Sequence, residues 1–144
     1  MTIKISVAIP DSAVSDNFDI REKTIKLGMI ARALAIFEVD DLLIYRDPTI
    51  SNDKSTYERR FMRNVLSYIE TPQYLRKILF PFHKDLQYAG HLPPLATSHH
   101  PIEKIKAKQF REGVLFLNKN KEPLVEVGAE TPLPVMANPG IPLK

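Results

Sequence analysis

The sequence predicts an α/β fold, and three observations in its first fifty residues support that prediction. Apolar residues at positions 3, 5, 7 and 9 alternate with polar or small ones, which predicts a strand over Ile3–Ile9. Residues Leu27–Phe37 form a mostly apolar helical segment, and Leu42–Tyr45 is a short apolar run. A strand, a helix and a second strand within about forty-five residues predict a βαβ crossover with parallel strands.

The helical segment Leu27–Phe37 contains one charged residue, Arg32. Gly28 and Ile36 lie one turn on either side of Arg32, so apolar residues nearly surround the helix. We therefore expect this helix to be covered on most sides, and a buried guanidinium must be paired or must face a ligand. Two interpretations stay open. Arg32 contacts a molecule that enters from outside, or it pairs with a carboxylate such as Asp11, Asp16 or Asp40.

The other helices follow from capping residues and from spacing. Asp19 is the predicted N-cap of the helix that contains Arg32. A second helix is predicted from about Ser55 to Glu70, and Thr71-Pro72 predicts the N-cap and first residue of a short third helix. In the third helix we expect Arg76 and Lys77 to face outward. The residues expected to face inward are Tyr74, Leu75, Ile78 and Leu79.

The second half of the chain is richer in proline and turns to a β pattern. Four prolines and Gly90 exclude regular structure over most of Pro81–Pro101. Two apolar runs, Gly113–Leu117 and Leu124–Val127, flank four polar residues and predict a hairpin. Beyond it only Leu133–Met136 could pair, and so few strands do not form a stable sheet. We therefore expect the second domain to be incomplete.

The composition is typical of a soluble globular protein. The 144 residues are 44% hydrophobic and 26% charged, and they include no cysteine. The lack of cysteine excludes a disulfide framework and a thiolate metal site. No stretch has the pattern of a signal peptide or the length of a membrane span, so a cytoplasmic protein is expected.

The net charge of +3 is unevenly distributed along the chain. Residues 51–110 carry ten Lys or Arg against five Asp or Glu, a net charge of +5, whereas residues 111–144 carry four against four. The middle third is therefore the candidate surface for a polyanion, because lysine and arginine displace counterions from phosphates. The alternative, that these charges only solvate helices, stays open.

No motif predicts a metal site or a nucleophile. The four histidines, His83, His91, His99 and His100, have no acidic or histidine partner at helical metal-ligand spacing. The sequence also lacks a glycine-rich phosphate loop and a Gly-x-Ser-x-Gly motif. Arg32 is therefore the one polar residue in an unusual setting.

Six segments carry a resemblance to a known group of enzymes. They are Val7–Ser12, Ile30–Phe37 with Val39-Asp40, Tyr68–Lys77, Leu86–Gly90 with Leu92–Leu95, His99–Pro101 and Phe110–Gly113. In this order they resemble the SPOUT superfamily of knotted RNA methyltransferases, specifically its family that carries an inserted small β-barrel. The resemblance implies residues 1–92 as the N-terminal part of the α/β knot domain, 93–109 as a Pro-rich basic linker and 110–144 as an incomplete OB-like β insertion.

The resemblance also implies a role for Arg32. Gly28-Met29-Ile30-Ala31-Arg32 fits the superfamily motif Gly-x-Ile-x-Arg, whose arginine is a catalytic residue that faces the RNA beside the cofactor. There it contacts a phosphate or assists proton removal. A planar and always charged fork suits phosphate recognition, so a positioning role is favoured for Arg32.

The resemblance implies an RNA substrate, either ribosomal or transfer RNA, a homodimer, and S-adenosylmethionine as methyl donor. The glycine-rich segments that bind this cofactor in the family are not found in the sequence, so no cofactor-binding residue is predicted. A non-catalytic RNA-binding or structural remnant is the alternative. The candidate RNA contacts are Arg59, Arg60, Arg63, Arg76, Lys77, His99, His100 and Arg111.

Overall fold

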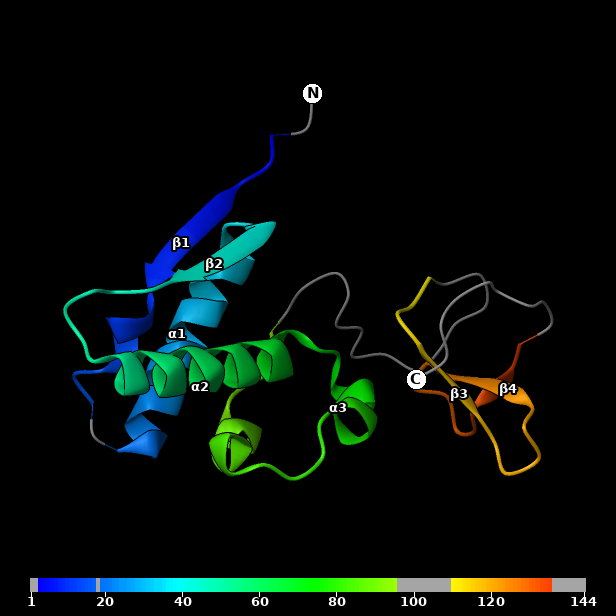
Figure 1. Ribbon diagram of the computed structural model, residues 1–144. Helices are drawn as coiled ribbons and strands as arrows, with labels where there is room; N and C mark the ends of the chain where they lie inside the picture. Colours follow the sequence, from blue (N-terminus) through cyan, green and yellow to red (C-terminus); the bar gives the residue numbers. More distant parts are fainter. Residues whose placement is uncertain (1–2, 18, 96–109, 136–144) are drawn as a thin grey trace. The chain divides into compact units, whose positions relative to one another are not determined.

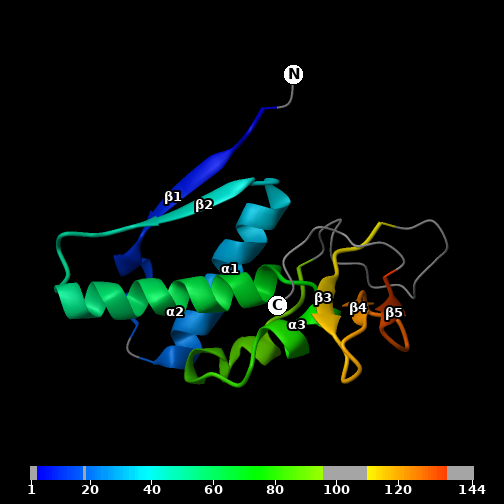
Figure 2. The ribbon, with the colours of Figure 1, turned by 45° about the vertical axis from the view of Figure 1, so that its right-hand side comes forward.

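The computed structural model describes residues 3–17, 19–95 and 110–135, and Figures 1 and 2 show their helices and strands. The chain divides into two compact units. The first comprises Met1–Glu70 and Phe82–Ala96, and the second comprises Thr71–Pro81 and the segment from Thr97 onward. One sheet is parallel and the other antiparallel, which confirms a mixed α/β chain. The knot, the OB-like barrel and the domain boundaries stay predictions.

The first unit begins with the predicted βαβ crossover. Strand β1 (Ser6–Pro10) pairs in parallel with β2 (Asp41–Tyr45), in a register that runs from Ser6 opposite Asp41 to Pro10 opposite Tyr45. Strand β1 is shorter than the predicted Ile3–Ile9, and Ile3 is 82% exposed. The reason is that β2 starts opposite Ser6, so the described residues offer no strand partner for the preceding segment.

Helices α1 (Ile20–Ile36) and α2 (Asn52–Glu70) are the two long helices of the first unit. Asp19 is the N-cap of α1, as predicted, because its Oδ1 accepts a hydrogen bond from the backbone N–H of Arg21 at 2.9 Å. Helix α2 starts three residues before the predicted Ser55. Ser51 lies just before it, and its Oγ accepts from Lys54 N at 3.4 Å, which stabilises the earlier start.

The core of the first unit lies where α1 crosses behind α2, below the two strands in Figures 1 and 2. Leu27 of α1 and Phe61, Met62 and Val65 of α2 are fully buried there. The proline-rich stretch contributes two short 3-10 helices, η2 (Lys84–Leu86) and η3 (Ala89–His91), and three leucines that pack against the core: Leu86, Leu92 and Leu95. This stretch therefore packs against the core of the first unit and is not a separate segment.

The second unit contains the predicted hairpin. Strand β3 (Val114–Leu117) pairs antiparallel with β4 (Pro123–Glu126), which pairs with β5 (Leu133–Pro134). Asn118 forms the turn, since its Oδ1 accepts from the backbone N–H groups of Asn120 and Glu122, each at 2.9 Å. An asparagine side chain that replaces backbone hydrogen bonds in this way favours a tight reversal of the chain.

Helix α3 (Gln73–Leu79) contacts the residues that flank this sheet through Tyr74. Tyr74 Oη donates to Glu112 O at 2.9 Å, and a Cβ at Gly128 would lie 2.7 Å from Tyr74 Cγ. Gly128 also has φ +79°, so glycine is required there by both conformation and space. The absence of a side chain at Gly128 therefore lets the Tyr74 ring lie close to the backbone just after β4.

Two sequence expectations for α3 are wrong. Pro72, not Thr71, occupies the N-cap position, so the helix starts at Gln73. Arg76 is buried at 9% exposure, whereas Ile78, expected to face inward, is 46% exposed. Arg76 is tolerated inside because its Nε donates to Thr71 O at 2.9 Å, and a helix of two turns is too short for its pattern to fix a face.

Candidate functional site

Arg32 lies on an exposed face of α1, so the expectation that this helix is covered on most sides is wrong. Ile25, Met29 and Ile36 are 46%, 63% and 68% exposed, and Arg32 is exposed among them. Positions 25, 29, 32 and 36 follow helical spacing, and together they form what we call the Arg32 face. The sequence has apolar residues on both sides of α1, but the described residues cover only the side that contains Leu27.

The three carboxylates considered as partners of Arg32 are engaged elsewhere. Asp11 accepts from Asp47 N at 2.9 Å, Asp16 accepts from Lys26 Nζ at 2.9 Å, and Asp40 accepts from Ile5 N at 2.8 Å. Within residues 3–17, 19–95 and 110–135, no side chain forms a hydrogen bond or an ion pair with the Arg32 guanidinium. The interpretation as a buried ion pair is therefore not supported, and Arg32 is accessible to a ligand.

Helix α2 presents the predicted arginines, Arg59, Arg60 and Arg63, and all three are exposed. The Nε atom of Arg59 lies 3.9 Å from Asp11 Oδ2, and that of Arg60 lies 3.6 Å from Asp85 Oδ2. The guanidinium carbon of Arg60 also lies 5.5 Å from the centre of the Tyr57 ring. A carboxylate on one side and a ring on the other hold the Arg60 guanidinium over the helix surface.

Asp85 is a buried carboxylate that sequence reasoning missed. It is 4% exposed, and its Oδ2 accepts from Asn64 Nδ2 at 2.8 Å in addition to its contact with Arg60. The His83 ring is fixed nearby, because its Nδ1 accepts from the Asp85 backbone N–H at 3.2 Å. Asp85 thus joins the segment after α3 to the basic surface of α2.

Asp11, directly after β1, was considered only as a partner of Arg32, but it joins the two strand ends to α2. It is fully buried, and its two oxygens accept from Asp47 N and from Ser55 Oγ. The hydrogen bond from Ser12 to Asp47 lowers the pKa of the Asp47 carboxyl, so this carboxylate stays charged at neutral pH. This network holds the carboxyl ends of both parallel strands against the N-terminus of α2.

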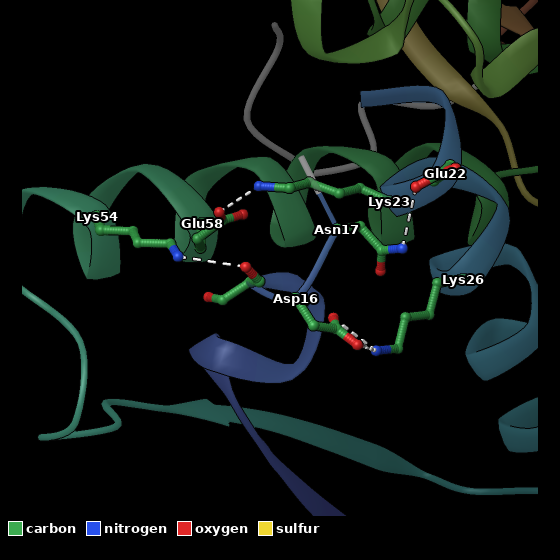
Figure 3. A network of polar contacts seen from close by, with 8 residues as sticks. Asp16, Asn17, Glu22, Lys23, Lys26, Lys54 and Glu58 are labelled. Carbon is green, nitrogen blue, oxygen red and sulfur yellow. Dashed lines mark hydrogen bonds and ion pairs between the residues drawn. The ribbon is translucent and has the colours of Figure 1, made fainter. Parts of the chain in front are cut away.

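A buried ion pair joins the two long helices (Figure 3). Lys23 Nζ of α1 donates to Glu58 Oε1 of α2, and the two side chains are only 8% and 1% exposed. Lys23 Nζ also lies 5.6 Å from the centre of the Tyr57 ring. Helical spacing could have indicated that both charged residues face the core. Lys23 precedes the buried Leu27 by four residues, and Glu58 precedes the buried Phe61 by three.

The remaining predicted RNA contacts lie in the second unit or outside the described residues. Lys77 is exposed, whereas Arg76 is buried with its Nε on Thr71 O. The Arg111 guanidinium carbon lies 5.7 Å from the centre of the Tyr74 ring. His99 and His100 lie outside the described residues. The structure thus brings Arg59, Arg60 and Arg63 together on α2, and separately places Arg111 beside α3.

The residues that the structure describes do not fit S-adenosylmethionine. Nucleotide-like cofactors are held where glycines let the backbone approach the ligand. A Cβ at Gly28 would lie 2.8 Å from Leu92, and one at Gly113 would lie 2.7 Å from Val125, so the protein's own side chains fill these spaces. Among the described glycines only Gly90 has open space beside it, and a single glycine does not form the glycine-rich segment that such a cofactor needs. In the same described ranges, no three His, Cys, Asp or Glu residues are grouped as metal ligands, and no helix is long and apolar enough to span a membrane.

A family profile and two named relatives match most of the chain. Residues 4–142 match the profile of a family described as "Putative RNA methyltransferase". Over 123 residues the chain is 37% identical to the human protein named 28S rRNA (uridine-N(3))-methyltransferase, covering 77% of this chain and 32% of that protein. A Drosophila melanogaster protein of the same name is 36% identical over 135 residues, covering 82% and 28%. The chain thus spans about a third of the length of these relatives.

Proposed function

Because the chain belongs to this RNA methyltransferase family, we propose that it forms part of an enzyme that methylates RNA. The two relatives described above are named as methyltransferases of 28S ribosomal RNA, so ribosomal RNA is the first substrate to consider. The structural observation that supports the proposal is Arg32, an exposed guanidinium with no partner among the described residues. Such a group is available to a phosphate of the substrate.

In this proposal Arg32 positions the RNA. A guanidinium can hold a phosphate by two parallel hydrogen bonds, which fixes the direction as well as the distance of the bound group. Arginine side chains keep their proton in proteins, so proton removal from the target base is assigned to another group. The exposed arginines of α2, Arg59, Arg60 and Arg63, would bind further phosphates, as would Lys77 and Arg111 of the second unit.

We further propose that the complete protein has the SPOUT-type knot and uses S-adenosylmethionine as methyl donor. Since the described residues do not fit this cofactor, we assign its binding to other segments of the complete protein. The β3–β5 sheet would belong to an OB-like insertion that contacts single-stranded RNA. The chain described here would therefore supply the substrate side of the active site.

A homodimer is proposed from the apolar character of the Arg32 face. Ile25, Met29 and Ile36 are large and exposed, and covering them would be favourable by about 25 cal/mol for each Å² removed from water. For Arg32 to bind RNA in such a dimer, the second copy must cover the apolar side chains and leave the guanidinium open to solvent. The cytoplasmic location expected from the sequence stays a prediction.

The second candidate function is an RNA-binding or structural protein without catalysis. The observation that favours it is the filled space beside Gly28, Gly113 and Gly128, which leaves Gly90 as the only described glycine with open space for a ligand. Both candidates predict RNA binding. Only the first predicts methyl transfer by the complete protein.

Methyl transfer is tested with the complete protein, S-adenosylmethionine labelled in its methyl group, and large-subunit ribosomal RNA from cells that lack the protein. We expect label in the RNA and, after digestion to nucleosides, in 3-methyluridine. The matched control is the same RNA from cells that have the protein, which is already modified and should take up little label. Absence of label from both RNAs, together with retained RNA binding, would favour the non-catalytic candidate.

A further inference from the structure

The segment just after α3 holds an aromatic ring beside several cations. Phe82 is 95% exposed, and the next two residues are His83 and Lys84, both exposed. A single exposed apolar side chain is common on protein surfaces. Phe82, however, lies three residues before Asp85, a buried carboxylate that contacts the guanidinium of Arg60.

The geometry around Asp85 fixes the groups next to Phe82. Asp85 Oδ2 lies 3.6 Å from Arg60 Nε, and the Asp85 backbone N–H donates to His83 Nδ1 at 3.2 Å. His83 Nδ1 also lies 3.4 Å from Asp85 Oδ2, so Nε2 is the ring nitrogen that remains for a ligand. Both Arg60 and His83 are about half exposed. Each side chain is therefore oriented by its contact with Asp85 and is still accessible to solvent.

The charge of this surface favours an anion. Arg60, Arg63 and Lys84 contribute three positive charges against the single negative charge of Asp85. Although Arg60 Nε lies 3.6 Å from Asp85 Oδ2, the Arg60 side chain is 56% exposed, so it is accessible to an anion. An aromatic ring next to such donors matches the way proteins bind single-stranded nucleic acid, with a base stacked on the ring and phosphates at the cations.

We propose that Phe82, His83, Lys84 and Arg60, here called the Phe82 site, bind one nucleotide of a single-stranded RNA segment. The base stacks on Phe82, and the adjoining phosphate is bound by Arg60 and Lys84 with His83 Nε2–H as a further donor. This inference rests on the proposed RNA substrate, and it names a surface that holds the RNA at a position separate from Arg32. Asp85 acts as a positioning residue, since it contacts Arg60 and not the RNA.

The test measures the affinity of the complete protein for a labelled single-stranded RNA by fluorescence anisotropy at several salt concentrations. Phe82→Leu keeps an apolar side chain but removes the π face, and we expect it to weaken binding about 5- to 100-fold, as for loss of one base–aromatic stack. The salt dependence should not change, because no charge is removed. Phe82→Trp keeps an aromatic face, so its affinity for the RNA should equal or exceed that of the unchanged protein.

Arg60→Gln is expected to lower the slope of log Kd against log salt by about 1, as for loss of one phosphate contact. The control is Lys4→Gln, which removes one positive charge from the exposed start of the chain and should leave the slope unchanged. If Phe82→Leu binds single-stranded RNA like the unchanged protein, or weakens duplex binding equally, the Phe82 site is wrong. If the unchanged protein neither binds nor methylates RNA, the proposed function itself fails.

Discussion

Replacing Arg32 by alanine in the complete protein is expected to lower the rate of methyl transfer by about 10- to 150-fold, as for loss of a charged hydrogen-bond pair worth about 1.5–3 kcal/mol. The free energy of unfolding should change by less than about 0.5 kcal/mol, because the side chain is exposed and has no partner among the described residues. Initial rates at saturating RNA, compared with denaturant unfolding curves, measure the two effects separately.

Two further variants sharpen this result. Arg32→Lys keeps the charge but not the planar fork, so we expect it to restore only part of the lost activity. Arg21→Ala is the matched control, since Arg21 is an exposed arginine in the first turn of the same helix and should leave methyl transfer unchanged. Parallel losses of activity and stability in Arg32→Ala would show that Arg32 maintains the fold and does not bind substrate.

Replacing Glu58 by alanine is expected to destabilise the chain by about 3–5 kcal/mol, because it leaves the Lys23 ammonium buried without its counter-charge. Lys23 and Glu58 are 6% and 1% exposed as residues, so water cannot replace the lost partner without opening the contact between α1 and α2. Chemical denaturation monitored by far-UV circular dichroism measures this difference as a shift of the unfolding midpoint.

The double variant Lys23→Met with Glu58→Leu is the control for the Glu58→Ala result. Replacing both charges by apolar groups of similar volume is expected to restore most of the stability, since a buried ion pair often contributes little net free energy over an apolar contact. One oxygen of Glu58, Oε2, is buried without a hydrogen-bond partner among the described residues, which adds to the cost of the native pair. A double variant as unstable as Glu58→Ala would mean that the pair itself stabilises the fold.

The elements with a clear period could be predicted from the sequence. The alternation before Pro10 and the apolar run at Leu42–Tyr45 predicted two parallel strands, and Asp19 predicted the start of α1. The hairpin about Asn118 followed from polar residues between two apolar runs. In each case the local pattern and the final packing agree, so a short stretch of sequence contains enough information.

The surroundings of side chains were predicted less well. The apolar residues beside Arg32 indicated burial, but the period of a helix does not show how many of its faces are covered. Arg76 and Ile78 exchanged their expected positions because α3 has only seven residues. Spacing places Lys23 and Glu58 on the buried faces of their helices, but it does not show that they pair with each other. Nothing in the sequence near Asp85 signals its partner Arg60, which is distant in the chain.

The central claim is that this chain supplies the RNA side of a methyltransferase active site, and that the methyl donor is bound elsewhere. Calorimetric titration of these 144 residues with single-stranded RNA and, separately, with S-adenosylmethionine tests both parts at once. The account predicts saturable, salt-dependent heat with RNA and no saturable heat with S-adenosylmethionine. Saturable binding of S-adenosylmethionine, or no binding of RNA, would contradict it.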